Sequence, residues 1–579
     1  MSRLVSPGYS RASLVNQILV PYADRFIEFK GLNRRSHVNE GEMSDMLNLT
    51  SDSYPLLRPR MLRGQMTLPA GVSKPLSIIT KYERIAMIAE KSNQSVAFYY
   101  DGTEITAVNN LTSDTEMVAI NNKICFFPQK TFLQIDRSGS DSYTIGEYGN
   151  LAYSTDSFDW LYVRFENGVA KLRTTASSSL AQNFKRGDAI NFDCTGIVDT
   201  GSGDEKAFDL NNSFVVQNTE EYNVTYTDPP HTVRYKEFVF ALEPFLAMIP
   251  AGATGFRFTG ELARECPDIH HVVEWNNRLW GVSDETNTIY ACKLGDPTNW
   301  QYYQGTGMDS YYAEQGTDEK WTGVAKYSGH IIFFKPNSMA RVYGTAPSNY
   351  QITNTICYGI EQGSSRSVGV VNDTVFYKSS IGVMAYDGGT PYSISDKFNC
   401  KFANAVGGTE GRKYYISFDN LDDSTHELMT FDLDLGIWHK EDDAAFRDTC
   451  TLGGRMYYIE DSDDSIRIIN PETVTETSAQ RPWMAVFGPF DEVDEDQKIF
   501  SRISLRFVAH GTASATVHIK MDDGTWELVK TFSQISTGGD SVIIIPRRCD
   551  RFSIKVSGTG DCEIKNLTRR FRRGSKIKP

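Results

Sequence analysis

Bulky apolar and polar residues alternate through residues 271–300, HVVEWNNRLWGVSDETNTIYACKLGDPTNW. The alternation runs up to Asn276 and Asn277, resumes at Leu279, and resumes again from Asn287 after a polar turn. Period-two alternation interrupted by short polar turns is typical of antiparallel strands joined by hairpins. We therefore expect a strand meander in this stretch.

The same element recurs along the second half of the chain. Five segments align on the first bulky apolar residue after a polar turn: LWGVS at 279–283, IIFFK at 331–335, VFYKS at 375–379, YYISF at 414–418 and MYYIE at 456–460. An all-β unit that recurs roughly every 40 to 50 residues has the spacing of propeller blades, because one small sheet cannot bury its face alone. Two upstream segments share the texture, SVAFYY at 95–100 and KICFFP at 123–128. The pattern predicts seven blades, with six as the alternative because these two segments lie closer together.

The remaining stretches lack the blade rhythm and divide the chain into regions. The predicted fold is all-β: a β-propeller with an inserted small β-barrel or sandwich and a C-terminal β-sandwich of five alternating strands. The expected regions are an extended N-terminal arm at 1–65, first blades at 66–140, the inserted domain at 141–266, the remaining blades at 267–478 and the sandwich with a basic tail at 479–579. Within the arm we expect one short helix at 40–49.

Composition and charge narrow the function classes. The formal net charge of −14 over 579 residues argues against an outer surface that grips nucleic acid, although it leaves open an acidic channel through which DNA slides. The nine cysteines are scattered and form no CxxC pair, which favours reduced thiols in a protein assembled in the cytosol. The amino-terminal apolar patch is interrupted by Asn16 and Gln17, so we expect no signal peptide. No segment is apolar for long enough to span a membrane.

The sequence gives little support to catalysis. Glycoside hydrolysis needs two carboxylates that face each other across a sugar. The Asp-rich segments are instead typical of turns in which aspartate caps backbone amides. The stretch from Asp434 to Trp438 is expected to be such a turn, with Trp438 packed between blades. We predict that the chain is not an enzyme and has no catalytic residue.

Cofactor and metal sites have equally little support. His270 and His271 are adjacent, so on a regular strand they would point to opposite faces and could not share one ion. No HExxH, GxSxG or phosphate-binding GxxxxGK motif occurs. We predict no cofactor-binding residue, no cofactor and no metal ligand, and calcium in the Asp-rich turns stays open.

Seven stretches in order resemble the propeller-type tail tubular, or nozzle, proteins of tailed bacteriophages, which include the tail-hub stabilisation proteins. The matching stretches are SDSYPLLRPR at 51–60, NNRLWG at 276–281, KLGDPTNW at 293–300, VYGTAPSNYQI at 342–352, GVMAYDGGTPYSIS at 382–395, FDLDLGIWHKED at 431–442 and PRRCDRFSIKVSG at 546–558. They run through the whole chain except the insertion, where only FKRGDAI is similar.

The resemblance implies a structural protein of the virion tail that is assembled in the host cytoplasm. Members of the family form rings, often of six identical subunits, next to the portal and adaptor proteins, and genomic DNA passes through their channel. The family has no catalytic motif to transfer to this chain. The alternative is a receptor- or glycan-binding tail protein, with or without polysaccharide depolymerase activity.

The proposed partner-binding residues lie in the N-terminal arm. They are Asp52, Tyr54, Pro55, Arg58, Pro59 and Arg60. Prolines reduce the conformational freedom lost on docking, and arginines make forked hydrogen bonds to carboxylates. We expect this segment to dock on a neighbouring subunit or adaptor protein. The alternative, that the segment packs along its own propeller, stays open.

The basic C-terminal stretch TRRFRRGSKIKP also allows two interpretations. It is either a solvated tail or a contact with an acidic neighbouring subunit or with DNA.

Overall fold

The computed structural model describes residues 22–138, 141–148, 151–155, 161–199, 205–490, 498–535 and 540–573. These residues fall into two compact units. The first unit contains the residues up to 95, residues 101–103 and those from 358 onward, and the second contains residues 96–100 and 104–357. The last six residues of the predicted basic tail and the first 21 residues of the predicted arm lie outside the described residues.

Seven four-stranded antiparallel sheets within the described residues are the blade units of a β-propeller. In six of them the four strands are consecutive in the chain, and in the seventh the N-terminal strand β5 is the fourth strand. The blades with strands from residues 72 to 147 are β6 (Val72–Lys81), β7 (Arg84–Lys91), β8 (Val96–Tyr100) and β9 (Thr103–Glu104); and β10 (Glu116–Ile120), β11 (Lys123–Phe127), β12 (Thr131–Asp136) and β13 (Ser142–Glu147). The next two are β22 (His270–Trp275), β23 (Arg278–Ser283), β24 (Thr288–Ala291) and β25 (Tyr311–Glu314); and β26 (Gly323–Tyr327), β27 (His330–Lys335), β28 (Ser338–Tyr343) and β29 (Gln351–Ile356).

The other three blades belong to the first unit. They are β30 (Gly369–Val371), β31 (Thr374–Ser379), β32 (Gly382–Tyr386) and β33 (Tyr392–Ser393); β34 (Phe402–Glu410), β35 (Lys413–Asn420), β36 (Thr425–Asp432) and β37 (Ile437–Lys440); and β38 (Phe446–Leu452), β39 (Arg455–Glu460), β40 (Ser465–Ile468) and β5 (Gly64–Met66). Two short 3₁₀ turns occur: Pro347–Asn349 connects β28 to β29 within one blade, and Ser365–Ser367 precedes β30.

The five aligned segments of the second half are all second strands of their blades, in β23, β27, β31, β35 and β39. The prediction that they hold equivalent positions is confirmed. In the first of these blades Trp275 pairs with Arg278, so Asn276 and Asn277 form a two-residue hairpin loop. Both have positive φ, of 50° and 58°, which is the backbone that such a tight turn requires.

The first strands of successive blades pack side by side within each unit. In the first unit β30 contacts β34, β34 contacts β38, and β38 contacts β6, whereas in the second β10 contacts β22 and β22 contacts β26. Polar side chains reinforce one of these contacts: the Asp448 carboxylate on β38 accepts hydrogen bonds from the Ser77 hydroxyl at 2.7 Å and the Ile78 amide at 2.9 Å on β6. Stacking of first strands is the arrangement that defines a propeller.

The inserted domain is a single eight-stranded sheet. Its strands are β14 (Leu151–Ser154), β15 (Tyr162–Glu166), β16 (Val169–Thr175), β17 (Ala189–Asp199), β18 (Glu205–Val215), β19 (Asn218–Thr227), β20 (Pro230–Ala241) and β21 (Gly255–Arg264), with short helices α2 (Ser179–Asn183) and α3 (Leu242–Leu246). Only Val216 and Gln217 separate the two outermost strands, β18 and β19. The Val216 amide donates to the backbone oxygen of Asp188, just before β17, and the Gln217 amide donates to that of Val239 on β20. The sheet therefore curls into a barrel around one core.

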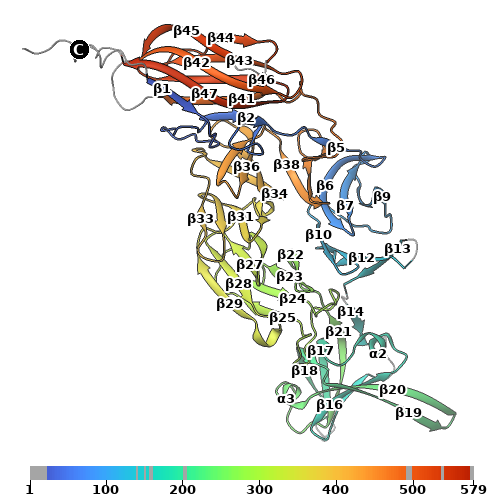
Figure 1. Ribbon diagram of the computed structural model, residues 1–579. Helices are drawn as coiled ribbons and strands as arrows, with labels where there is room; N and C mark the ends of the chain where they lie inside the picture. Colours follow the sequence, from blue (N-terminus) through green and yellow to red (C-terminus); the bar gives the residue numbers. More distant parts are fainter. Residues whose placement is uncertain are drawn as a thin grey trace, which may run out of the picture. The chain divides into compact units, whose positions relative to one another are not determined.

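The C-terminal sandwich takes strands from both ends of the described chain. One sheet contains β1 (Tyr22–Phe26), β47 (Cys562–Arg573), β42 (Lys498–Ala509) and β45 (Asp540–Cys549); the other contains β2 (Asp45–Leu47), β41 (Trp483–Phe490), β46 (Phe552–Thr559), β43 (Ser514–Met521) and β44 (Glu527–Phe532). Figure 1 shows the blue strands β1 and β2 beside the red strands of this sandwich. The sequence predicted five C-terminal strands, but seven occur among the described residues, because β41 was missed and one predicted segment forms both β43 and β44. Residues 568–573 of the predicted basic tail belong to β47, and the N-terminal partner strands were not predicted.

The N-terminal region departs from its predicted form. No helix occurs at 40–49, because the amide of Met43 bonds to Gly31 and that of Ser44 to Val486, and Asn48 has a positive φ of 54°. The backbone is thus committed to neighbouring segments instead of to its own turns. The described arm is not a free extension: β3 (Leu49–Thr50) pairs with β4 (Arg58–Pro59), and β5 completes the last blade.

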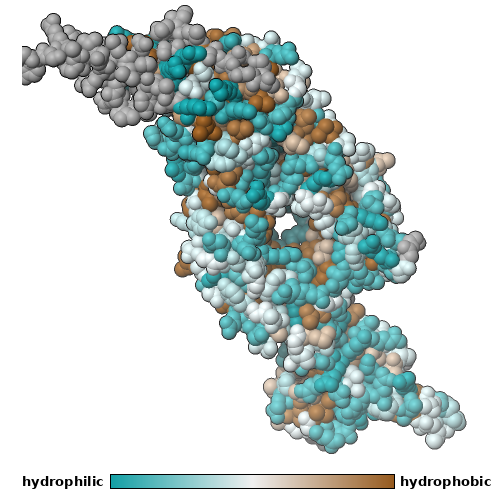
Figure 2. Space-filling view, in the orientation of Figure 1, coloured by the Kyte–Doolittle hydropathy of each residue, from teal (hydrophilic) through white to brown (hydrophobic). Residues whose placement is uncertain are grey.

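Region boundaries differ slightly from those expected. The first blades extend to Glu147, because β13 pairs with β12, and the inserted domain begins at β14. None of the nine cysteines, all of which lie in described segments, forms a disulfide. Among the described residues no helix is long and apolar enough to cross a membrane. On the face drawn in Figure 2, apolar residues form small patches among polar ones.

Candidate functional site

The segment with the predicted partner-binding residues is a short hairpin in the first unit. Strands β3 and β4 pair, and the loop between them turns twice, with Tyr54 N donating to Ser51 O and Leu56 N to Ser53 O. Buried Leu57 exchanges backbone hydrogen bonds with Ile564 of β47. The apolar residues of the segment belong to one core shared with blades β30 to β37 and with the sandwich.

Three of the six predicted residues lie at the surface: Asp52, Tyr54 and Pro55. The Tyr54 side chain is 39% exposed, and Glu28 accepts a hydrogen bond from its hydroxyl. Asp52 forms an ion pair of 2.5 Å with Lys413. Burial alone would raise the pKa of Asp52, but the charge and hydrogen bond of Lys413 outweigh it, so the pKa is lowered.

Asp52 and Tyr54 line a groove of about 550 Å³. Its opposite side is formed by the β34–β35 and β36–β37 turns, with Glu410, Arg412 and Asp434 among its residues. Arg412 and Asp434 are ion-paired, and Asn470 donates a 2.6 Å hydrogen bond to Glu410. Burial raises the pKa of Glu410 to about 7. The groove therefore has a charged rim with one carboxyl group poised to take up a proton near neutral pH.

The other three predicted residues, Arg58, Pro59 and Arg60, are engaged within the chain. Arg58 makes a forked contact with Asp561 at the start of β47, at 3.0 and 2.7 Å. Pro59 is buried, and Arg60 is only 4% exposed. The forked hydrogen bonds expected of these arginines thus go to carboxylates of their own unit.

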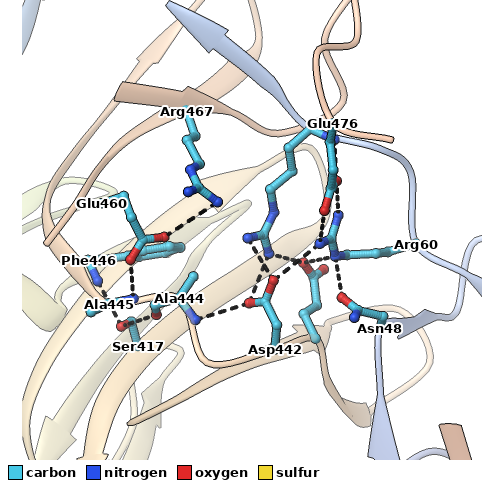
Figure 3. A network of polar contacts seen from close by, with 12 residues as sticks. Asn48, Arg60, Ser417, Asp442, Ala444, Ala445, Phe446, Glu460, Arg467 and Glu476 are labelled. Atoms are coloured by element: carbon cyan, nitrogen blue, oxygen red, sulfur yellow. Dashed lines mark hydrogen bonds and ion pairs between the residues drawn. The ribbon is translucent and has the colours of Figure 1, made fainter. Parts of the chain in front are cut away.

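Arg60 is the centre of a buried network of charged groups (Figure 3). Its guanidinium donates to both oxygens of Glu476 at 2.8 and 2.9 Å, to Asp442 at 3.2 Å and to the Asn48 side chain at 2.7 Å. These partners come from the loop after β37, from the chain that leads to the sandwich and from the turn before β3.

Arg63 completes the network from the other side. It contacts Asp442 at 2.8 Å and Glu441 at 3.0 Å, and its guanidinium lies 5.4 Å from the centre of the Tyr458 ring. Burial alone would raise the pKa of Asp442, but the charges of Arg63 and Arg60 lower it. Within the network the carboxylates of residues 441, 442 and 476 contact the guanidiniums of Arg60 and Arg63, and the Arg481 guanidinium donates to the backbone oxygen of Arg60.

Carboxylates in and beside this network also accept hydrogen bonds from the backbone that connects two blades. Asp442 accepts the Ala444 amide at 3.2 Å, and Glu460 accepts the Ala445 amide at 2.9 Å (Figure 3). The Ser417 hydroxyl donates to Ala444 O at 2.8 Å. The network therefore fixes the connection between blades β34–β37 and β38–β5 as well as the N-terminal segment.

Two further sequence predictions can be compared with the structure. Trp438 is 2% exposed, donates to Ile394 O at 2.7 Å and packs on Phe398 after the preceding blade, as expected for a residue between blades. The predicted orientation of the two adjacent histidines, on opposite faces of a strand, is wrong. His271 has a positive φ of 49° at a bulge, and the His270 and His271 rings lie 4.7 Å apart. Even so, the described residues contain no group of three or more His, Cys, Asp or Glu arranged to hold a metal ion.

Sequence reasoning missed Arg63, Glu441, Asp442 and Glu476. Each is an ordinary charged residue in a turn or loop, and its partner is distant along the chain. The one available signal was the density of arginines in RPRMLR at 58–63 beside an acidic chain.

Comparisons with known proteins find only weak likenesses. No family model and no curated protein matches the chain. Among solved structures, BamB from Moraxella catarrhalis matches over 72% of this chain and 100% of its own, with 9% identity and a TM-score of 0.33. The β-propeller domain of the trilobed protease from Pyrococcus furiosus matches over 70% and 100%, with 8% identity and a TM-score of 0.29. The sialidase of Trypanosoma rangeli matches over 96% and 97%, with 9% identity and a TM-score of 0.20.

The blade topology itself defines the class: the chain is a β-propeller protein with an inserted β-barrel and a C-terminal β-sandwich. At the identities and scores above, none of the three likenesses carries information about activity.

Proposed function

We propose that the chain is a structural protein of a bacteriophage tail, a nozzle or hub subunit that forms a ring with identical copies. In this proposal the ring, often of six subunits, binds the adjoining portal, adaptor or tail proteins and surrounds part of the channel through which DNA leaves. The proposal rests on the resemblance of seven ordered stretches to such proteins. The observation that supports it best is the buried network at Arg60 and Arg63.

That network suits a rigid structural subunit. It ties the N-terminal segment to the last two blades and to the chain that enters the sandwich. A buried ion pair is expensive to break, because the remaining partner is left as an unpaired charge. A subunit that transmits force between neighbours benefits from such fixed connections.

The groove beside Asp52 and Tyr54 is the proposed docking surface for a neighbouring protein. Tyr54 supplies an exposed amphipathic ring, and Pro55 beside it is exposed as well. Aromatic residues are enriched at the centres of protein interfaces. Arg58 and Arg60 position this loop through contacts within the chain.

We further propose that the chain is not a hydrolase. Glycoside hydrolysis requires two carboxylates with a sugar between them. Four acidic residues line the groove. Asp434 is paired with Arg412 and Asp52 with Lys413. Asp432 accepts a hydrogen bond from Ser51 and Glu410 accepts one from Asn470, so each carboxyl group already has a partner within the chain. A direct check is to incubate purified protein with host capsule and cell-wall polysaccharides and count reducing ends. Release above a heat-killed control that is lost in Asp434→Asn would refute this part.

Electron microscopy tests the structural proposal. Purified protein is imaged by negative stain, and phage particles are labelled at the carboxyl terminus of this chain. We expect closed rings of the purified protein and label at the tail next to the portal. Label at the tips of fibres, or on no part of the particle, would overturn the proposal.

A further inference from the structure

A cavity of about 550 Å³ lies in the second unit, where the inserted barrel meets the blade β22–β25. Strands β17 and β18 of the barrel line one side, through residues such as Asn191 and Ser213. The blade lines the other side with Tyr290, Tyr303 and Tyr312. Its volume is within the range of small-molecule sites, which commonly occur where two domains meet.

The two walls are joined by hydrogen bonds. The Ala189 amide donates to Gln301 O at 2.9 Å, and the Tyr303 amide donates to Gly187 O at 2.6 Å. The Asn299 side chain donates to the buried Asp188 carboxylate at 2.9 Å. Gly187 has a φ of 93°, and a Cβ there would meet the Gln304 side chain and the Tyr302 ring, so the walls approach closely. The cavity is therefore a preformed feature of the junction.

Aromatic rings dominate the blade side. Tyr312 is 57% exposed, and its ring meets that of Tyr303 edge-on, with centroids 6.3 Å apart. Trp300 also lines the cavity. An exposed tyrosine inside a concave site offers an unused ring face to a ligand.

The polar lining consists mainly of uncharged donors and acceptors. Asn191, Ser213 and Gln301 supply amide and hydroxyl groups, and the Ser213 hydroxyl donates to Asn191 at 2.6 Å. Glu265 is exposed and is the one charged residue among the described residues that line the cavity. Such a lining offers nothing cationic to a phosphate group, and its carboxylate repels one.

We propose that this cavity binds a pyranose unit of a polysaccharide chain. The polarised C–H groups of a sugar face are attracted to the negative face of an aromatic ring. Sugar hydroxyls can exchange hydrogen bonds with the amides, with the Ser213 hydroxyl and with Glu265. A single carboxylate lacks the partner that hydrolysis needs, so the site binds sugar without cleaving it. The inference goes beyond the tail proposal and does not depend on it.

Saturation-transfer NMR on the full-length chain tests the proposal, since the method detects weak ligands of large proteins. The probes are the methyl pyranosides of glucose, galactose, mannose, rhamnose and N-acetylglucosamine. We expect transfer to the ring C–H protons of at least one of them. In Tyr312→Ala this transfer falls at least about fivefold, because an aromatic contact is lost.

Tyr392→Ala is the matched control, because Tyr392 is 48% exposed and, like Tyr312, lies on the fourth strand of its blade. Transfer in this control stays at the wild-type level. Glu265→Gln, at an exposed position, is a second variant and weakens transfer by removing the charged acceptor. Thymidine monophosphate is tested in the same way, as a probe for nucleotide binding instead of sugar binding.

Three results would overturn the proposal. The first is no transfer to any of the five sugars in the wild-type protein. The second is an equal loss of transfer in Tyr312→Ala and Tyr392→Ala. The third is transfer to the base protons of the nucleotide without transfer to any sugar.

Discussion

The N-terminal segment, residues 22–66, and the inserted barrel, residues 151–264, both lack the blade rhythm, yet the segment packs on other regions of the chain whereas the barrel packs mainly on itself. The segment buries charged side chains, and Arg60 and Arg63 find their partners at Glu441, Asp442 and Glu476. The barrel buries a cluster of aromatic rings of its own, in which the Phe192 ring lies 5.2 Å from Phe214.

The N-terminal segment therefore connects other regions of the chain, whereas the inserted barrel is a separate module. The segment supplies single strands to both sheets of the sandwich and to the last blade, and its apolar residues join a core built by other regions. It has no fold without them. The barrel builds its own core from its own strands, so its stability depends mainly on local packing. We expect damage to the segment to spread through the first unit and damage to the barrel to stay local.

Arg63→Met is expected to have the most widespread effect. It leaves Glu441 and Asp442 buried with Arg60 as their remaining partner in the network, and such a loss typically costs about 3–5 kcal/mol. Urea unfolding of the full chain should show a fall of this size, with lost hydrogen-exchange protection in both the last blade and the sandwich. Arg35→Met is the control, because the Arg35–Asp396 pair is about half-exposed, and it should change stability by less than about 1 kcal/mol. Equal effects of the two variants would show that the network is not what holds the segment.

Phe192→Ala tests the other side of the comparison. Its ring contacts those of Phe214, Phe240, Phe245 and Phe258, so truncation should destabilise the barrel by about 3–5 kcal/mol. Hydrogen exchange should lose protection in strands β15 to β21 and keep it in β34 to β37. Loss of protection in those blade strands as well would contradict the modular view.

The charged regions of the first unit also respond to pH, and Glu410→Gln exposes one such response. The pKa of Glu410 is about 7 in the folded chain, above its ordinary value of 4.5. The unfolded chain therefore loses this proton first, and the group removes stability as pH rises from about 4.5 to 7. The neutral variant should be more stable than wild type by about 1–2 kcal/mol at pH 8, a value discounted for the partial exposure of the side chain.

At pH 4 the same variant should match the wild type, because the carboxyl group is protonated in both states. Glu472→Gln, at a pair whose carboxylate is 79% exposed, serves as the control and should change little at either pH. A variant that stabilises equally at both pH values would indicate that burial of the charge is not the cause.

The sequence predicts the blades well because their information is local. Each hairpin such as Trp275–Arg278 places its alternating strands and its turn within a few residues. One blade strand was misassigned: SVAFYY is the third strand of its sheet and not the second. The second strand, β7, pairs with β6 through two register shifts, which obscure the alternation of apolar and polar residues. That placement explains why SVAFYY and KICFFP lie unusually close and why the count is seven.

The N-terminal strands and the charged network could not be predicted in the same way. Strands β2 and β5 have three residues each, too few to show a period, and their partners lie at Met484–Val486 and Ile466–Ile468. Arg63 lies in an arginine-rich stretch, but nothing local in the sequence points to Asp442 as its partner. Of the six predicted partner-binding residues, the sequence located a surface loop at Asp52, Tyr54 and Pro55, whereas only the structure assigns Arg58 and Arg60 to contacts within the chain.

Tyr54→Ala has the smallest expected effect on stability and the sharpest bearing on function. The side chain is exposed and lies outside the buried network, so the free energy of unfolding should change by no more than about 0.5 kcal/mol. If the loop docks on a neighbouring protein, losing this ring should nevertheless impair ring or particle assembly, because exposed aromatic anchors contribute strongly to interfaces. Assembly is followed by negative-stain microscopy and by complementation of phage growth, with Tyr392→Ala as the control at a similarly exposed tyrosine. Normal assembly of Tyr54→Ala would remove the loop from the docking surface, whereas impaired assembly without loss of stability would separate the surface residues of the segment from those that only hold it in place.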